Sequence, residues 1–197
     1  MQQVVIIVFL FCVGICRGQT LILPILEEAQ GIVEGAYYKD LDNELGKFVG
    51  TWKYTSGTSS FTITLQKKTM FFESYDNCYK DIIIGEYKYV SNGVEIVNTL
   101  NNLNVNYTNQ YKYNLSGLVI KDRFTTTAGN RNIELNFIDP ARSYLNRGIF
   151  VNYIAPSGSV PAKIKVKFTG SMAIPPTDSS PTDIRVPEVD YILTKQP

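Results

Sequence analysis

Apolar and polar residues alternate with a period of two over most of the chain that follows residue 50. In residues 51–66 two alternating runs flank a Ser-Gly-Thr turn, which predicts a hairpin with one apolar face and one wet face. The apolar positions of this hairpin are Trp52, Tyr54, Phe61, Ile63 and Leu65.

The same alternation continues beyond the hairpin. In residues 82–89, Ile83, Gly85, Tyr87 and Tyr89 share one face. The Asn-Gly pair that follows is a strong hairpin signal, because both residue types tolerate a positive φ. Further strands are expected at 94–98, 111–113, 118–124, 133–138, 149–153, 162–168 and 189–194.

These runs are short and recur at roughly 10-residue spacing, which favours an all-β fold over alternating βαβ units. The prediction is a lipocalin-like antiparallel barrel of eight or more strands, with a sandwich as the other architecture that the pattern allows. A short helix is expected before the first strand, from residue 42 or 43 to 47, because Asp42 or Asn43 can cap it. Residues 174–187 are rich in Pro, Ser, Thr and Asp and are expected to form a long loop.

The first 18 residues are typical of a signal peptide. Residues 4–15 are almost uninterruptedly apolar, and this run is too short to span a bilayer. The small residues Cys16 and Gly18 suit signal peptidase, so we expect cleavage after Gly18 and export of the chain. Lipid anchoring through Cys16 and a retained anchor are alternatives, although Ile15 is large for the position before a lipidated cysteine. Residues 19–36 would then form an irregular lead-in and residues 37–197 the barrel domain.

The composition excludes several kinds of chemistry. Histidine is absent, so neither a Ser-His-Asp triad, a Cys-His pair nor a histidine metal ligand can exist. The net charge of +1 gives no reason to expect nucleic acid or an anionic membrane as a partner. After cleavage Cys78 is the only cysteine, so no intramolecular disulfide can form, and we expect a buried, unreactive thiol.

Clustered carboxylates offer the remaining route to catalysis. Asp40, Asp42 and Glu44 alternate, but Leu45 and Thr51 occupy the positions where a calcium loop needs Gly and Glu. These carboxylates are better explained by favourable interactions with the first turn of a helix. Asp81 and Glu86 are a second candidate acid–base pair. We expect no metal, no cofactor and no enzymatic activity, and a carboxylate-based hydrolase is the weakest of three functional hypotheses.

Other patterns have ordinary structural explanations. Lys163, Lys165 and Lys167 alternate with apolar residues and could bind an anionic polymer, but such lysines more often solvate an outer strand face. The 13 tyrosines could stack on sugar rings, but aromatic residues are also favoured in strands. Asn106 and Asn114 begin glycosylation sequons, which matter only in a eukaryotic secretory route.

The segment Gly50-Thr51-Trp52 resembles the Gly-x-Trp opening of lipocalin and calycin barrels. The resemblance implies that Trp52 closes the base of the barrel and that a cation of the last strand packs over its ring. Lys195 is the candidate cation, although the family usually supplies Arg at this place. Gly50, Trp52 and Lys195 are therefore expected to have structural roles.

A second resemblance covers residues 37–197. The ordered segments are similar to an uncharacterised family of exported Bacteroidetes proteins, a domain of unknown function. This resemblance implies export and a β-rich domain, and it carries no known activity or catalytic residue. The matching segments are Tyr38-Lys39-Asp40, Asn43-Glu44-Leu45, Phe48-Val49-Gly50-Thr51-Trp52-Lys53-Tyr54, Leu65-Gln66-Lys67-Lys68, Gly85-Glu86-Tyr87-Lys88-Tyr89, Asn92-Gly93-Val94-Glu95, Asn98-Thr99-Leu100 and Leu193-Thr194-Lys195-Gln196.

Together these patterns favour an exported, non-catalytic barrel. A barrel of about eight strands has room inside for side chains alone or for one small ligand. The leading hypothesis is a binding module for a small apolar or aromatic ligand, and the alternative is a structural or protein-interaction module with a filled core. The candidate ligand-lining residues are Trp52, Tyr54, Phe61, Ile63, Leu65, Tyr87 and Tyr89.

Overall fold

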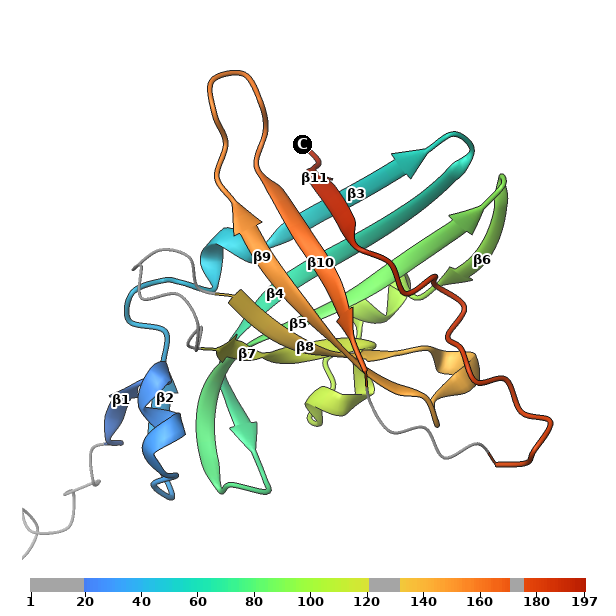
Figure 1. Ribbon diagram of the computed structural model, residues 1–197. Coiled ribbons are helices and arrows are strands. Elements are labelled where there is room, and N and C mark those ends of the chain that lie inside the picture. Colours follow the sequence, from blue (N-terminus) through green and yellow to red (C-terminus); the bar gives the residue numbers. More distant parts are fainter. Residues whose placement is uncertain (1–19, 121–131, 171–175) are drawn as a thin grey trace, which may run out of the picture.

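The alternating segments form the wall of a closed antiparallel barrel in the computed structural model (Figure 1). The structure describes residues 20–120, 132–170 and 176–197. Eight strands build the wall: β3 (Gly50–Ser56), β4 (Ser59–Glu73), β5 (Cys78–Ser91), β7 (Leu115–Ile120), β8 (Asn132–Ile138), β9 (Asn146–Ile154), β10 (Lys163–Thr169) and β11 (Tyr191–Lys195).

The strands follow one another around the barrel in the order β5–β4–β3–β11–β10–β9–β8–β7, and β7 pairs back onto β5. The far end of β5 pairs instead with β6 (Val94–Asn98), which lies outside the closed circuit. Closure leaves no unpaired edge among the eight wall strands, which removes the usual template for edge-to-edge aggregation. The predicted all-β antiparallel barrel is confirmed, and it fits the lipocalin-like class.

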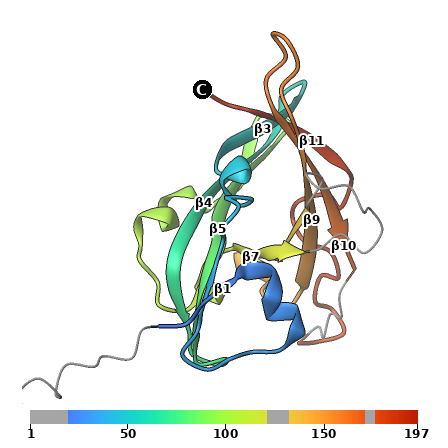
Figure 2. The same ribbon diagram turned by 90° about the vertical axis from the view of Figure 1, so that its left-hand side faces the viewer.

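The lead-in contains β1 (Ile22–Pro24) and the 3-10 helix η2 (Ile25–Gln30), whose Ile25 is buried in the barrel core, and β2 (Tyr37–Lys39) follows it. β1 runs parallel to β2, and β2 runs parallel to the start of β5. Figure 2 shows that this segment and the long β9–β10 hairpin loop lie at opposite extremes of the molecule.

The expected helix before the first barrel strand is a single 3-10 turn, η3 (Gly46–Phe48). The side chain of Asp40, rather than that of Asp42 or Asn43, accepts hydrogen bonds from the backbone N–H groups of Glu44 and Leu45. Because Asp40 is itself held by the barrel wall, it fixes this turn in a tight conformation and no longer helix develops.

The strand expected at residues 111–113 is wrong. This stretch contains the 3-10 helix η5 (Gln110–Lys112), and the side chain of Asn109 accepts a hydrogen bond from the N–H of Tyr111 at its start. Together with η4 (Leu100–Asn104), η5 belongs to a crossover from β6 to β7 over the outer wall. Tyr113 is buried there against Ile82 and Ile84, whereas Tyr111 is exposed, so the two tyrosines do not share the buried face that a strand would give them.

Other strand boundaries also differ from expectation: β4 continues to Glu73 beyond the expected end at residue 66, β5 starts at Cys78 rather than at residue 82, and β9 starts at Asn146 rather than at residue 149. β7 begins at Leu115 rather than at residue 118, and residues 121–124 lie outside the described residues. The last strand is Tyr191–Lys195 rather than 189–194. The 3-10 helix η6 (Pro140–Arg142) joins β8 to β9.

Residues 176–190 form a long connection without helix or strand, as expected for the part of the loop that the structure describes. Among the described helices, none combines the length and the apolar character needed to cross a membrane.

Candidate functional site

The inner face of β3, β4 and β5 is built from three rows of residues, set by the strand register. Each row crosses the three strands. All seven predicted ligand-lining residues lie in these rows, and all of them belong to the hydrophobic core cluster or pack against it. The rows are Tyr54–Phe61–Tyr89, Trp52–Ile63–Tyr87 and Gly50–Leu65–Gly85. Six of the seven predicted residues are buried, and Tyr54 is half-buried against the cluster. Whether they line a ligand site stays a prediction.

Trp52 of β3 is buried where η3, β9 and β11 meet the start of this strand. Its indole N–H donates to the carbonyl oxygen of Phe48 in η3 (2.8 Å), and its ring meets Tyr153 of β9 edge to face. Lys195 Nζ lies 5.2 Å from the centroid of the indole ring. These contacts join the first wall strand, the last wall strand and the 3-10 turn at one place.

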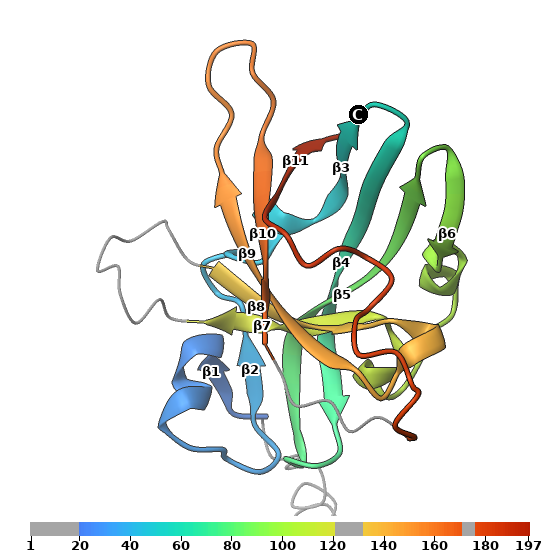
Figure 3. The same cartoon turned by 45° about the vertical axis from the view of Figure 1, so that its right-hand side comes forward.

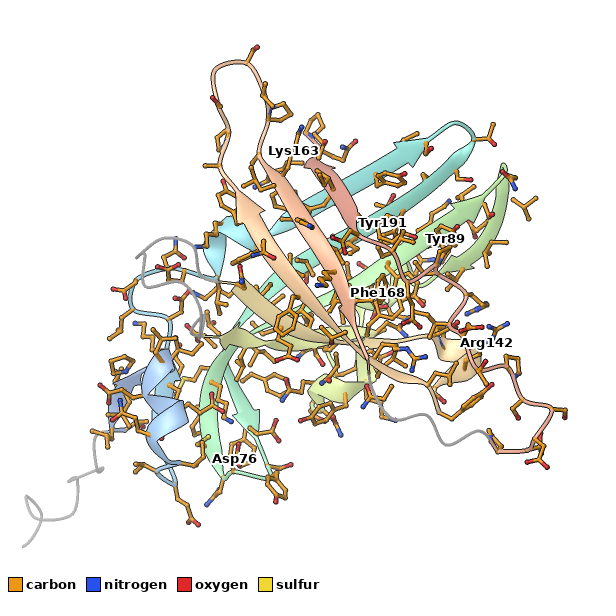
Figure 4. The ribbon with its side chains drawn as sticks, in the orientation of Figure 1. Asp76, Tyr89, Arg142, Lys163, Phe168 and Tyr191 are labelled. Atoms are coloured by element: carbon orange, nitrogen blue, oxygen red, sulfur yellow. The ribbon has the colours of Figure 1, made fainter. Side chains whose placement is uncertain are left out.

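Aromatic rings from five different strands meet in the interior on the side of the β3–β4 turn. Phe61 of β4 lies 4.9 Å from Tyr191 of β11, and Tyr87 of β5 lies 4.5 Å from Phe137 of β8, measured between ring centroids. Phe168 of β10 contacts both Phe137 (5.1 Å) and Tyr191 (6.3 Å). Because these strands lie around the whole barrel wall, the protein's own side chains occupy the centre at this level. Figure 4 labels Tyr89, Phe168 and Tyr191 in this region.

A strap, defined as residues 176–190, lies over this aromatic end. Figure 3 shows it running from the side of η6 across the front of the barrel to β11. Ile184 and Val186 of the strap are buried in the barrel core. The hydroxyl of Tyr191 donates to the carbonyl oxygen of Pro187. The strap therefore adds two apolar side chains to the core, and its Pro187 carbonyl oxygen accepts the hydrogen bond that the Tyr191 hydroxyl can donate.

Asp139 and Arg185 fix the strap. The Asp139 side chain is 1% exposed, and it accepts hydrogen bonds from the Arg185 backbone N–H (2.9 Å) and from the Arg185 guanidinium Nε (2.9 Å) and Nη2. Arg185 Nη1 also donates to the carbonyl oxygen of Ile96 in β6 (3.1 Å). Although burial alone would raise the pKa of Asp139, the bonds from Arg185 and the N–H of Ala141 lower it. Asp139 therefore stays ionised and bound.

Tyr87, which lies near this ion pair, is unsuited to act as an acid or a base. The Tyr87 hydroxyl donates to the carbonyl oxygen of Ile138 (3.3 Å). Burial, reinforced by the Asp139 carboxylate, raises the pKa of Tyr87. The phenol stays protonated at all physiological pH values, so it can act as a hydrogen-bond donor and not as a nucleophile.

Two buried carboxylates, Asp40 after β2 and Asp81 on the inward-facing side of β5, meet in a structural network. Lys67 Nζ lies 2.8 Å from Asp40 and 3.6 Å from Asp81. Asp81 also accepts hydrogen bonds from the Tyr37 hydroxyl and from the backbone N–H groups of Asp40 and Met70. Sequence reasoning did not pair Asp40 with Asp81, and their oxygens are occupied by protein donors. The network ties the lead-in to the bulge of β4.

Glu86, the expected partner of Asp81, is buried elsewhere on the outer face of β5. The Asn114 N–H donates to its Oε1 (3.2 Å), whereas its Oε2 and the Ser116 hydroxyl find no hydrogen-bond partner among the described residues. Burial raises the pKa of Glu86 to about 7, although the nearby Thr99 hydroxyl and the hydrogen bond from the Asn114 N–H act to lower it. Burial therefore favours the protonated form of this carboxyl.

The remaining candidates take ordinary places. Cys78 is free and buried against Ala36 and Tyr38, and burial raises the pKa of its thiol. Asn114 is buried at the start of β7, so its sequon is inaccessible, whereas Asn106 is exposed and accepts a hydrogen bond from Lys68. Among the residues that the structure describes, no group of three or more His, Cys, Asp or Glu side chains could hold a metal ion.

Sequence reasoning placed Phe168 on the inward face of its strand but did not single out Phe137 and Tyr191, which complete the ring cluster. Phe137 shares the inward face of β8 with Leu135, and Tyr191 shares that of β11 with Leu193, so the period of two could have identified both. No such signal exists for Asp139 and Arg185, which are 46 positions apart in irregular segments.

Comparisons with known proteins give a family and no activity. Neither the curated proteins nor the solved structures include a match. A family model matches residues 1–196, nearly the whole chain. The chain therefore belongs to DUF6705, a family of unknown function.

Proposed function

We propose that this protein is an exported, non-catalytic interaction module: a barrel with a filled core that presents its outer wall to a partner. The observation that carries the proposal is the contact, inside the barrel, of rings from strands that are not paired with each other, above all the Phe61–Tyr191 and Tyr87–Phe137 pairs. At this level the protein's own side chains, rather than a ligand, form the core.

The state of the carboxylates supports a non-catalytic role. General acid–base catalysis needs groups that can reach a substrate. Asp40, Asp81 and Asp139 are buried and bound by a lysine, an arginine or backbone N–H groups. Glu86 has a shifted pKa but is fully buried in the wall. A hydrolase that used one of these four carboxylates would need it to open to solvent.

Export is supported by the sequence. The apolar run at residues 4–15, followed by Cys16 and Gly18, is typical of a cleaved signal peptide of a bacterial protein. Amino-terminal sequencing of the secreted protein tests this, with a first residue of Gln19 expected. A mature chain that still begins at Met1, or that carries lipid on Cys16, would contradict cleavage after Gly18.

A small apolar or aromatic ligand inside the barrel is the second candidate function. The strap favours it, because Ile184 and Val186 are core residues on a segment that lacks regular structure. If the strap opens, it withdraws two apolar side chains from beside Tyr191 and creates space for a ligand of similar size.

Titration with a neutral aromatic fluorophore, N-phenyl-1-naphthylamine, separates the two candidates. A filled core predicts no saturable fluorescence increase and no rise in melting temperature as the fluorophore is added. One-to-one binding that raises the melting temperature, and that Tyr87→Leu weakens while exposed Phe72→Leu does not, would overturn the filled-core proposal and establish the ligand function.

A further inference from the structure

Lysine side chains form a row across the outer wall of the barrel. The register places Lys163 of β10 opposite Thr194 of β11, and Thr194 opposite Lys53 of β3. It continues through Thr62 of β4 to Lys88 of β5. Lysines therefore occupy every second strand, and neighbouring members of the row start roughly 10 Å apart, because adjacent strands are about 4.8 Å apart.

The lysines of this row point outward. Lys53 is exposed between Trp52, which is buried, and Tyr54, which packs against the core. Lys163 lies between Ala162 and Ile164, which are both buried. Side chains alternate between the faces of a strand, so both ammonium groups belong to the solvent side. Figure 4 shows Lys163 at the base of the projecting β9–β10 hairpin, beside β11.

Most of the positive charge on β10 and β3 is unbalanced. Lys165 pairs with Asp190 (2.7 Å) and Lys88 pairs with Glu95. Within the described residues, Lys53, Lys163 and Lys167 form no ion pair. We call Lys53, Lys163, Lys165 and Lys167 the basic strip.

Exposed aliphatic side chains lie among these lysines. Ile154 is paired in register with Lys163, and Ile192 with Lys165, and these isoleucines are 43% and 51% exposed. Val160 is 48% exposed in the hairpin loop that projects from the barrel (Figure 1). The large exposed aromatic residues, Phe72, Tyr75 and Tyr111, are on other elements of the described structure.

This combination selects one kind of partner. Lysines attract anionic headgroups, and aliphatic side chains enter the boundary between headgroups and acyl chains. A carbohydrate partner would be expected to need aromatic platforms on this face. We propose that the basic strip, with Ile154, Val160 and Ile192, docks the barrel on an anionic lipid surface. The inference rests on the proposed function, in which the outer wall is the working surface.

Vesicle co-sedimentation tests the inference with the purified protein. The probe is vesicles of equimolar phosphatidylcholine and phosphatidylglycerol, compared with phosphatidylcholine alone. The test variant is Lys53→Gln/Lys163→Gln. Its control is Lys39→Gln/Lys112→Gln, which changes net charge equally at two exposed lysines of β2 and η5. A second pair of variants compares Val160→Ser with Val105→Ser, a valine of similar exposure next to η4.

We expect binding to the anionic vesicles alone, weakened by salt, and reduced on the order of tenfold by the test variant. Val160→Ser should also reduce it, whereas both controls should bind like the wild type. Melting temperatures of all variants should match, which separates lost binding from lost folding.

Three results would overturn the inference: no wild-type binding to anionic vesicles, equal losses in the test and control variants, or binding to soluble polygalacturonate in place of vesicles. In each case the fluorophore titration still decides the filled core separately. Failed vesicle binding with no fluorophore uptake removes the lipid partner and leaves the interaction module standing.

Discussion

Lys195 Nζ lies 5.2 Å from the centroid of the Trp52 ring, and the same side chain covers Gly50. A Cβ atom added at Gly50 would meet Lys195 Cε at 3.1 Å, and Gly50 has a φ of +126°, which side chains rarely tolerate. Lys195 and Trp52 also pair in register between β11 and β3. Lys195 of β11 therefore contacts both Trp52 and Gly50 of β3, and these contacts link the first and last strands of the wall.

Replacing Lys195 by Ala should lower the free energy of unfolding by about 0.5–1 kcal/mol, because the contact between the cation and the indole is at an exposed site. Urea denaturation measures this change. Lys195→Arg should keep the wild-type value, and exposed Lys112→Ala is the control. Equal stability of Lys195→Ala and wild type would show that the contact contributes nothing.

The strands of the barrel could be predicted because each has one buried and one wet face. Ile164 and Val166 of β10 and Ala162 just before it are buried, while the lysines between them face solvent, so the period of two is visible in the sequence. β5 was predictable on its inner face for the same reason. Its outer face is apolar at Ile82 and Ile84 because the η4–η5 crossover covers it.

Elements held by distant contacts could not be predicted. The 3-10 turn η3 depends on Asp40, whose position is set by Lys67 and Asp81 of the barrel wall. The basic strip depends on register, since Lys53 and Lys163 are far apart in the chain and meet only through β11. Local periodicity carries no information about either relationship.

Replacing Arg185 by Ala should destabilise the protein by about 3 kcal/mol, because it leaves the buried Asp139 carboxylate without its charged partner. Lys at this position should rescue little, since it cannot reproduce the two-pronged guanidinium contact. Chemical denaturation at pH 7 gives the value. The control is Arg142→Ala, which removes a single bond from a guanidinium to the strap carbonyl of Asp183. A cost for Arg185→Ala no larger than that of the control would contradict the role of this ion pair.

The same pair should govern stability in acid. The pKa of Asp139 is lowered in the folded state, so its contribution is present above the unfolded pKa and is lost as the pH falls through the folded one. Arg185→Ala removes the main group that lowers this pKa, so the difference in stability between wild type and the variant should be largest near neutral pH and should narrow as the pH falls. Chemical denaturation of both proteins at several pH values measures this difference. A difference that stays constant into acid would exclude Asp139 as the responsible group.

Glu86 should give the opposite pH dependence. Its pKa rises from 4.5 to about 7 on folding, so the folded state holds the proton more tightly. The contribution of Glu86 to the free energy of unfolding should therefore be greatest below pH 4.5. It should fall by about 3 kcal/mol as the pH rises to 7 and above. Glu86→Gln should remove this fall and be more stable than wild type at pH 8. Denaturation at several pH values tests it, with exposed Glu134→Gln as the control, and parallel stability curves for wild type and Glu86→Gln would refute it.

Gly117 marks the closest approach between two wall strands. A Cβ atom at this position would lie 2.1 Å from the carbonyl oxygen of Glu134 in β8, which is a backbone atom and cannot rotate away. Gly117→Ala must therefore separate β7 from β8 at the place where β7 also pairs with β5 and closes the barrel. Overpacking of this kind costs about 1–3 kcal/mol or more, so the melting temperature should fall by several degrees or the variant should not fold. Gly170→Ala is the matched control, because nothing lies within 4 Å of its added Cβ. If Gly117→Ala melts at the temperature of Gly170→Ala, the two strands can move apart without cost, and the barrel does not depend on tight closure at β7.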